Sequence, residues 1–506
     1  MTTAVDAEET LSPKVGITIL AVILAQLVGV MNTTVVATAI PSILRDLTGT
    51  PVEGTWILTI ALVGLAVSGP IWARLSDYFS PIVMVRIGLT ITMVCGILQS
   101  MMDSVLVIIL LRFVQAVGIG GILSLSLIIF ARVIPPRQRG KYTGWMSTAN
   151  LVGTMSGPFL GGLIAESTIG WRGAFVLIVP LALTALVLLQ FAEKIPAARG
   201  GGTRIDFVGA ILIVVSVTSI LVWLSFAGDL FEFVSPLGLG LIVGGGLCAV
   251  LLIVTELRAK APILPLRALR GRVMLLAIIA ATGNGSVIVP TALFMSMYLQ
   301  NGLEASPSLA GLILICTAAG NVITSFSVGF RSAKTGRLRR YLIGGGVFVV
   351  TGALLITRLG PDTPIWMAAL VLFTLGLGQG ALTQFIVLAA QNAVPISQVG
   401  AVSGFTQFSQ TLAGATTMSV FGAILGTQLV ALQGQGLSTA DAYATAIPQL
   451  FTGAVVAAGI ALIAVALLPP ILLRSTIDMK KVDEPAEPAA AAGPASPVEG
   501  DLGSTT

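Results

Sequence analysis

One arginine lies inside an apolar run of the sequence, where its charge needs partners. Arg112 follows the apolar stretch Val105–Leu111, and a guanidinium at the centre of a membrane helix costs about 2.5–3.5 kcal/mol on insertion scales. At a helical rise of about 1.5 Å per residue, Arg112 lies at the depth of Asn32 in the first apolar run. Two interpretations stay open: a structural tether to carbonyl groups, or a cation that faces a water-accessible chamber and binds substrate or responds to protonation.

The charge of Arg112 has no acid to neutralise it in the middle of any apolar run. Asn32 can accept a hydrogen bond but cannot cancel a charge. Because a low dielectric strengthens the uncompensated field, we expect the chamber to favour anionic or neutral amphipathic substrates over lipophilic cations.

A stripe of small residues follows in the next apolar run, and proline interrupts it. It contains Gly153, Gly157, Pro158, Gly161 and Gly162. Small residues let membrane helices approach closely. Tight packing on a neighbour is the simple interpretation, and the functional one adds that the same contact slides as two halves of the protein move.

Asp77 stands at the end of the second apolar run. It is either a solvated loop charge or a latch. A latch would accept hydrogen bonds from a helix N-terminus or pair with a nearby arginine, stabilising one conformation.

The composition is that of a polytopic membrane protein. Of 506 residues, 55% are hydrophobic and 10% are charged, against about 25% charged in a soluble domain. There is no histidine, the three cysteines lie in apolar runs, and the net charge is +5. We therefore expect no metal site, no disulfide framework, no cofactor and no nucleic-acid partner. Without clustered intramembrane acids, a soluble signalling domain or an ATP-binding loop, an enzyme, a sensor and a primary pump are all disfavoured.

Apolar runs long enough to span a bilayer, about 20 residues each, define the predicted all-α fold. We count fourteen: 16–41, 55–75, 82–101, 104–130, 141–165, 173–192, 207–227, 236–256, 273–298, 307–330, 341–358, 364–389, 400–425 and 445–472.

Charge predicts the orientation, since cytoplasmic loops collect Lys and Arg. With both termini cytoplasmic, only Arg45, Arg172, Arg358 and the intramembrane Arg112 fall outside the cytoplasmic segments, among 27 basic residues.

A weak internal repeat predicts two related halves. Residues 73–88 match 329–344, Gly118 and Gly120 match Gly376 and Gly378, and 154–157 match 411–414. Parallel repeats with a site at their interface are typical of transporters. The predicted organisation is a cytoplasmic tail (1–14), a six-helix bundle (15–193), a linker with two additional helices (194–272), a second six-helix bundle (273–474) and a disordered cytoplasmic tail (475–506).

Several segments together resemble the major facilitator superfamily, and within it the fourteen-helix drug:proton antiporter group. They are Met31–Pro41, Ala73–Pro81, Arg112–Gly118, the glycine-proline stripe, Trp171–Arg172 and Asp206–Gly209. The chain departs from that pattern at Asn32, where the family usually has an aspartate, and at Ala73 and Ser80–Ile82 in the loop around Asp77.

The resemblance implies a cavity lined by the first, fourth, ninth and twelfth helices. It favours the following polar residues as substrate-binding positions: Asn32, Arg112, Gln115, Asn284, Gln379 and Gln384. From the residues alone, each amide is as well explained by a hydrogen bond between helices.

The expected function is secondary transport by alternating access: two six-helix bundles rock about a central site in the plasma or inner membrane. The resemblance implies proton-coupled efflux of drugs or amphipathic small molecules, so that the partners are a small-molecule substrate, protons and the lipid bilayer. Asn32 motivates the alternative of a facilitator or an anion-linked exchanger for anionic or neutral metabolites. The oligomeric state stays open.

Overall fold

The computed structural model describes residues 12–134, 136–165, 169–197, 206–226, 230–232, 234–259, 262–395 and 398–470. Every regular element in these ranges is helical, which confirms the predicted all-α membrane fold. Most of the two predicted tails lies outside them. The elements are α1 (Pro13–Asp46), α2 (Pro51–Leu75), α3 (Pro81–Ser100), α4 (Val105–Val133), α5 (Pro136–Ala165), α6 (Arg172–Val176), α7 (Ile178–Gln190), α8 (Phe207–Phe226), α9 (Pro236–Arg258), η1 (Leu266–Arg270), α10 (Arg272–Met297), η2 (Tyr298–Gly302), α11 (Pro307–Thr335), α12 (Arg339–Ile356), α13 (Ile365–Asn392), α14 (Val399–Gly434) and α15 (Thr439–Ala466).

Local sequence explains where several helices begin. A serine or threonine N-cap is followed directly by proline at Ser12–Pro13, Thr50–Pro51, Ser235–Pro236 and Ser306–Pro307. The hydroxyl accepts a hydrogen bond from an otherwise unpaired backbone N–H, and proline suits the first helical position because no bond is needed from its nitrogen.

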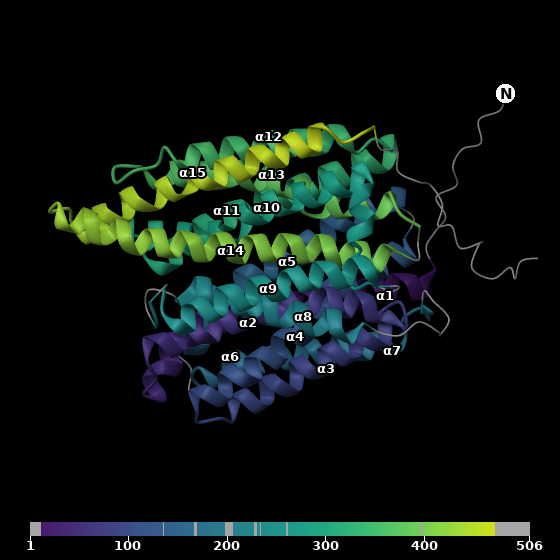
Figure 1. The fold of residues 1–506 in the computed structure, drawn as a ribbon, viewed down its shortest axis with the longest axis horizontal. Helices are drawn as coiled ribbons and strands as arrows, with labels where there is room; N and C mark the ends of the chain where they lie inside the picture. The colour runs from purple at the N-terminus through teal and green to yellow at the C-terminus, as the bar shows by residue number, and fades with distance from the viewer. Residues whose placement is uncertain are drawn as a thin grey trace, which may run out of the picture.

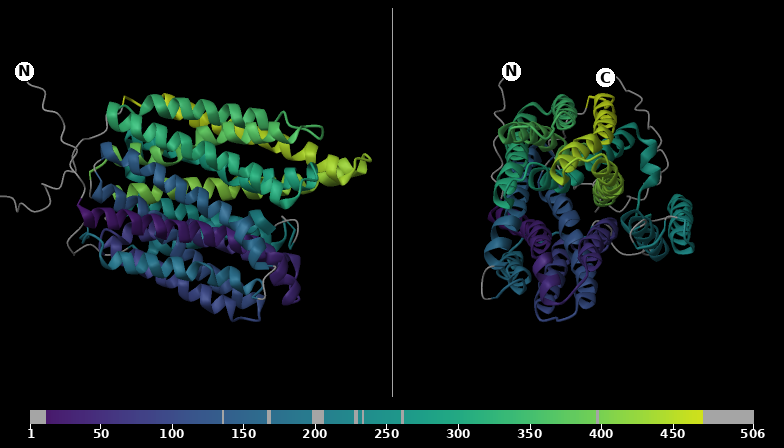
Figure 2. Two further views of the ribbon diagram at one scale, coloured as in Figure 1. Left: turned by 180° about the vertical axis from the view of Figure 1, so that it is seen from behind. Right: turned by 90° about the vertical axis from the view of Figure 1, so that its left-hand side faces the viewer.

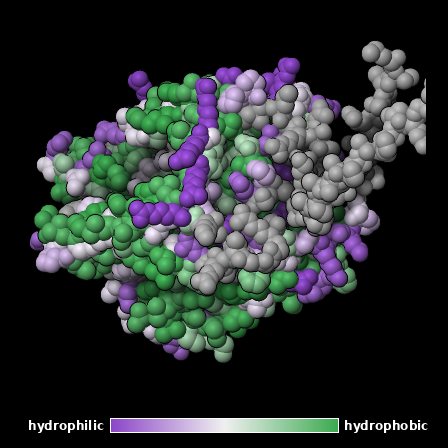
Figure 3. Space-filling model, turned by 45° about the vertical axis from the view of Figure 1, so that its right-hand side comes forward, coloured by the Kyte–Doolittle hydropathy of each residue, from purple (hydrophilic) through white to green (hydrophobic). Residues whose placement is uncertain are grey.

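Thirteen helices among the described residues are long and apolar enough to cross a membrane, with α6 and α7 forming one span. The 30-residue α5 is not among them, because it is rich in glycine, serine and threonine. The predicted number of fourteen spans therefore stays a prediction. Outward-facing aliphatic side chains such as Leu106, Leu110 and Ile211 are more than half exposed, and broad hydrophobic areas cover the surface in Figure 3, as a lipid-facing protein requires.

The helices form two groups, the N-bundle (α1–α7) and the C-bundle (α10–α15). In Figure 1 the N-bundle lies below and the C-bundle above. In the N-bundle, α1 packs on α5, and α4 packs on α2 and α3. The C-bundle repeats this arrangement, with α10 on α14 and α13 on α11 and α12. The pair α8–α9 stands at the edge (Figure 2, right), where α8 touches both α2 and α14.

The repeat extends to single close contacts. In four pairs, a Cβ added at the first residue would lie within 3.1 Å of the backbone oxygen of the second. Gly64–Phe113 in the N-bundle corresponds to Gly320–Phe373 in the C-bundle, and Gly88–Gly118 corresponds to Gly345–Gly378. The contacts thus pair Gly118 with Gly378, two residues beyond the Gly376 that the sequence match suggested.

The first part of the glycine stripe packs on α1, which supports the predicted tight packing on a neighbouring helix. A Cβ at Gly157 would lie 2.7 Å from Thr34 Cβ, and one at Gly153 would lie 2.9 Å from Val30 Cβ, both on α1 of the same bundle. Thr34 Oγ1 also donates a hydrogen bond to the Gly153 carbonyl at 2.8 Å. In this structure the two glycines therefore pack within the N-bundle, and a role in sliding stays a prediction.

The contact of α5 with the other half uses another face of the helix. Ser147 Oγ donates to Ser325 Oγ of α11 at 2.8 Å, and Trp145 meets Phe326 edge-on. Pro158, Gly161 and Gly162 belong to α5, but their surroundings lie outside what the structure describes.

A test of this packing replaces Gly376, where an added Cβ would lie 2.0 Å from the Thr317 carbonyl oxygen of α11. Gly376→Ala should destabilise the protein by about 1–3 kcal/mol through overpacking, measured as a lower apparent melting temperature in detergent. The matched Gly344→Ala, which meets nothing within 4 Å on the same bundle, should be neutral or stabilising because alanine favours the helix. Equal effects of the two substitutions would contradict the packing described.

Candidate functional site

Arg112 of α4 is held inside the N-bundle by side-chain amides. Its Nη1 donates to Asn32 Oδ1 of α1 and, at 2.9 Å, to Gln115 Oε1 one turn further along its own helix. Its Nη2 lies 3.5 Å from the Asn32 carbonyl oxygen. The predicted meeting of Arg112 with Asn32 is therefore confirmed.

Helix α3 completes the surroundings of the guanidinium. Gln115 Nε2 donates to the Thr92 carbonyl at 3.0 Å, and Gln99 Nε2 donates to Gln115 Oε1 at 3.1 Å. We call Asn32, Gln99 and Gln115 the amide cage of Arg112. All its acceptors are neutral, and none of the ion pairs among the described residues includes Arg112.

The expected water-accessible chamber beside Arg112 is absent from this conformation. The Arg112 side chain is 1% exposed, and Asn32 and Gln115 are fully buried. Burial follows from the chemistry, since a guanidinium in apolar surroundings is tolerated only when acceptors surround it. Three atoms of the site nevertheless lack a hydrogen-bond partner: the donors Arg112 Nε and Asn32 Nδ2, and the acceptor Gln99 Oε1.

The C-bundle contains no counterpart of the cage. Matching contacts define which positions of the two bundles correspond. Besides the four glycine contacts above, Gly153 of α5 meets Val30 of α1, and in the same way Gln410 of α14 meets Gly285 of α10. The residues corresponding to Asn32, Thr92, Gln99, Arg112 and Gln115 are Val287, Val349, Ile356, Leu372 and Leu375, all apolar and at most 1% exposed. The fold does not need a buried charge at this place, because the second half forms the same contacts without one.

The polar residues predicted in the C-bundle form a separate group. Asn284 Nδ2 of α10 donates to Thr383 Oγ1 of α13 at 3.3 Å, and Thr383 donates to the Gln379 carbonyl at 2.9 Å. Asn284 is fully buried, Gln379 is buried and Gln384 is half-buried. Their contact with substrate, like that of the amide cage, stays a prediction.

Asp77 is fully buried, which excludes the solvated alternative. It lies at the end of the bundle where α1 begins and α15 ends, the terminus-bearing end. Its Oδ2 is 2.5 Å from Arg74 Nη1, and its Oδ1 is 3.9 Å from Arg132 Nη2. A Cβ at Gly400, the second residue of α14, would lie 3.4 Å from Asp77 Oδ1, so the carboxylate faces a helix N-terminus of the other bundle, where negative charge is favoured.

The basic partners of this contact are not apparent in the sequence. Arg132 Nη2 also donates to the Ser76 carbonyl at 3.1 Å. Arg139 of α5 donates to Gln391 Oε1 of α13 at 3.2 Å and to the Ala131 carbonyl, and so joins the two bundles. The spacing of Arg74 three residues before Asp77 was the one available signal, since Arg132 and Arg139 look like ordinary loop charges in the sequence. We call Arg74, Asp77, Arg132 and the start of α14 the latch.

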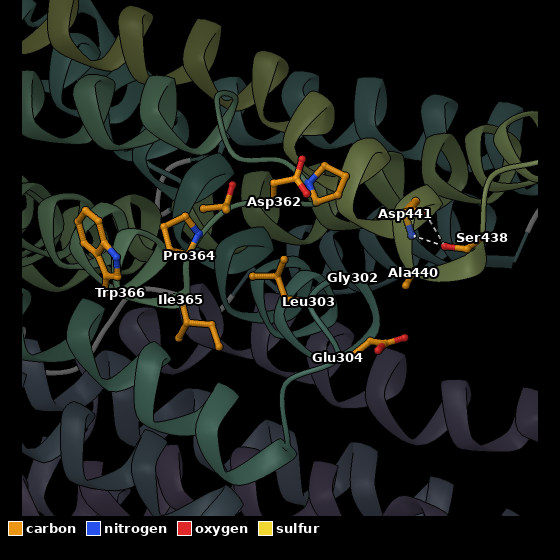
Figure 4. A pocket seen from close by; sticks show the side chains of 12 residues that line it. Gly302, Leu303, Glu304, Asp362, Pro364, Ile365, Trp366, Ser438, Ala440 and Asp441 are labelled. Atoms are coloured by element: carbon orange, nitrogen blue, oxygen red, sulfur yellow. Dashed lines mark hydrogen bonds between the residues drawn. The ribbon is translucent and has the colours of Figure 1, made fainter.

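The described residues also form a pocket of about 680 Å³ at the opposite end of the C-bundle. Figure 4 shows Glu304, Asp362 and Asp441 around it. All three are exposed, and Asp441 is engaged by the helix cap at Ser438. None of the predicted site residues lines this pocket.

The latch predicts a change of conformation when its acid is neutralised. Asp77→Asn should open the terminus-bearing end more than about tenfold in population, since loss of a buried charged partner costs about 3–5 kcal/mol. The measurement is a spin-label distance between Phe79 and Gln398, both exposed, in a chain whose three cysteines are replaced. The control Asp103→Asn removes an exposed pair with Arg172 and should leave the distance unchanged. An unaltered distance in Asp77→Asn would refute the latch.

The chain is similar in sequence to known proteins. The chain is 27% identical over 429 residues to an uncharacterized MFS-type transporter of Mycobacterium tuberculosis, a match that covers 85% of this chain and 62% of that protein. It is 27% identical over 407 residues to the multidrug transporter protein MdtP of Bacillus subtilis, covering 80% of this chain and 74% of that protein.

Two solved structures share the fold. The proton:xylose symporter XylE superposes with a TM-score of 0.64 at 15% identity, covering 92% of this chain and 99% of that one. The human organic anion transporter MFSD10 superposes with a TM-score of 0.61 at 16% identity, covering 88% and 100%. The family model of the Major Facilitator Superfamily matches residues 22–418. The match spans well over half of the sequence, and the chain therefore belongs to the Major Facilitator Superfamily, as a multi-pass membrane protein.

Proposed function

We propose that this protein is a proton-coupled exporter of amphipathic small molecules of the fourteen-helix group, and that it works by alternating access. The units 15–193 and 273–474 rock against each other, with 194–272 as the linker and the terminus-bearing end in the cytoplasm. Relatives named as multidrug transporters support efflux, and the distribution of Lys and Arg supports the orientation.

One observation carries the proposal: among the residues that the structure describes, only the N-bundle of the two repeated halves buries a charge. Arg112 and its amide cage replace residues that are apolar in the C-bundle. Buried polar groups that the fold does not require are typical of functional sites in membrane helices. The substrate reaches Arg112 when the bundles part, because this conformation covers it.

The cage also indicates the chemistry of the substrate. Of the three unpartnered atoms at the cage, Arg112 Nε and Asn32 Nδ2 are donors and Gln99 Oε1 is an acceptor. Asn32 also leaves the guanidinium charge uncompensated. A carboxylate or another hydrogen-bond acceptor satisfies these donors, whereas a cation would be repelled. This favours anionic or neutral substrates.

The neutral Asn32 also supports the second candidate, a facilitator or an anion-linked exchanger. In the antiporter the acid that exchanges protons lies elsewhere in the chain. In the facilitator no acid is needed, and the substrate equilibrates without accumulating.

Transport by purified protein in proteoliposomes separates the two candidates. With a pH gradient imposed, a carboxylate dye should accumulate several-fold against its own gradient, and an uncoupler should abolish that accumulation. A matched cationic dye should be transported at least about tenfold more slowly, a difference worth about 1.4 kcal/mol. Equilibration without accumulation would overturn proton coupling in favour of the facilitator.

Variants test the role of the cage in the same assay. Asn32→Asp should shift the preference toward the cationic dye by adding a buried negative charge, while the exposed control Asn301→Asp should not. A preference for the cation in the wild type that survives in Arg112→Ala would refute the proposed substrate class.

A further inference from the structure

Glu256, in the last turn of α9, is a buried carboxylate that neither the transport site nor the latch uses. Its side chain is fully buried although it lies near the terminus-bearing end, because Ile263 and Leu264 of the following segment are buried over it. Its Oε2 accepts a hydrogen bond from the Leu264 backbone N–H at 3.2 Å. Its Oε1 has no hydrogen-bond partner.

A second carboxylate, that of the half-buried Asp206, lies on the other side of Gly209 from this unpartnered oxygen. Asp206 precedes α8 and caps it through Oδ1, which accepts from the Gly209 N–H at 2.8 Å. The position that a Cβ would take at Gly209 is 2.9 Å from Asp206 Oδ2 and 2.9 Å from Glu256 Oε1. The two oxygens are therefore no more than twice that distance apart, in space that the missing side chain of Gly209 leaves open.

The surrounding charges do not balance two ionised acids. Among the described residues, Asp206 just before α8 and Arg74 of α2 are the charged side chains that act on Glu256, together with the backbone N–H groups of Ile263 and Leu264. Arg74 is committed to Asp77 at 2.5 Å, with Tyr78 beside it. On the C-terminal side of Glu256, Arg267 is bonded to the Leu257 carbonyl. None of the ion pairs among the described residues includes Glu256 or Asp206.

We propose that Asp206 and Glu256 form a proton-binding site, with one proton on Glu256 Oε1 donated toward Asp206 Oδ2. A fully buried carboxylate is more stable in its neutral form when its neighbouring cation, Arg74, is already paired with Asp77, and two neighbouring carboxylates cannot both ionise cheaply. When the O–H bond breaks, the proton passes to water at the terminus-bearing end, and the site becomes doubly negative.

A metal cation fits the site less well than a proton. Ca²⁺ takes six to eight oxygen ligands and Mg²⁺ demands an octahedron, whereas one oxygen of each acid here is already engaged by a backbone N–H. The described residues contain no group of three or more potential metal ligands.

The proton site also bears on the latch. When Glu256 is neutral, the guanidinium of Arg74 stays paired with Asp77. When Glu256 is ionised, it competes with Asp77 for that guanidinium. The additional helices α8 and α9 thereby report cytoplasmic pH to the contact between the bundles. This consequence rests on the proposed alternating access, whereas protonation of Glu256 does not, so the two can fail separately.

Infrared spectroscopy of the full-length protein in lipid tests the protonation directly. The wild type at neutral pH should show the carbonyl stretch of a protonated carboxylic acid, and Glu256→Gln should lose it. The matched control Glu232→Gln changes an exposed acid in the loop between the same two helices and should keep the band. Absence of the band in the wild type, or its persistence in Glu256→Gln, would overturn the proposal.

Two further variants separate a shared proton from a lone buried acid. Asp206→Asn should weaken the band, because an amide can donate to an ionised Glu256. Gly209→Ala should also weaken it by forcing the two oxygens apart, whereas Gly240→Ala on α9, with nothing within 4 Å, should not. A band unchanged in both Asp206→Asn and Gly209→Ala would refute the pair, and loss of the band on adding a magnesium or sodium salt at constant pH would assign a metal cation instead.

Discussion

A guanidinium buried among apolar helices must be surrounded by acceptors, and here every acceptor is neutral. Asn32, Gln115 and, behind them, Gln99 and Thr92 come from three helices of the N-bundle. Their hydrogen bonds fix α1, α3 and α4 relative to one another around one charge. Since no acid cancels that charge, the site keeps an affinity for negative or accepting groups that a buried ion pair would lack.

The two halves share their close packing but not the polar cage around Arg112. Close glycine contacts recur in both bundles, so the repeat preserves packing at the level of single backbone atoms. The polar cage is not preserved and is replaced by leucine, isoleucine and valine in the C-bundle. Both bundles therefore share the packing contacts, whereas the buried arginine at this position is found in the N-bundle alone.

The two bundles meet through charge as well as through packing. At the terminus-bearing end, Asp77 and its arginines face the start of α14, and Arg139 reaches Gln391 of α13. Each contact joins one bundle to the other through a group that can release its partner, which suits an interface that must open. Buried Glu256 lies close enough to Arg74 for their charges to interact, and we propose that its protonation influences that release.

Most of the helices could be predicted from apolar runs and N-cap residues in the sequence. The fourteen predicted runs lie on the observed helices, and proline after a serine or threonine cap marks where several of them begin. Depth along a helix was enough to pair Arg112 with Asn32. These features are local, or follow from the helical rise alone.

Contacts across helices could not be read from the sequence in the same way. The spacing of Gly153 and Gly157 defines one face of α5 but not the helix that it meets, which is α1. Asp77 and Glu256 stand at helix ends, where charges are usually solvated, and only the chain folded over them makes them buried. The open chamber expected at Arg112 depends on the conformation, which no pattern of residues specifies.

The stability of Asn32 variants tests most directly whether neutral amides hold the buried charge. Asn32→Ala should lower the apparent melting temperature in detergent, since a hydrogen bond to a charged group contributes about 1.5–3 kcal/mol. Asn32→Asp should preserve or raise it by forming an ion pair, and Thr374→Ala, an exposed hydroxyl bonded to its own helix, serves as the control. An Asn32→Ala protein as stable as the wild type would contradict the account, because Arg112 would then not depend on its cage.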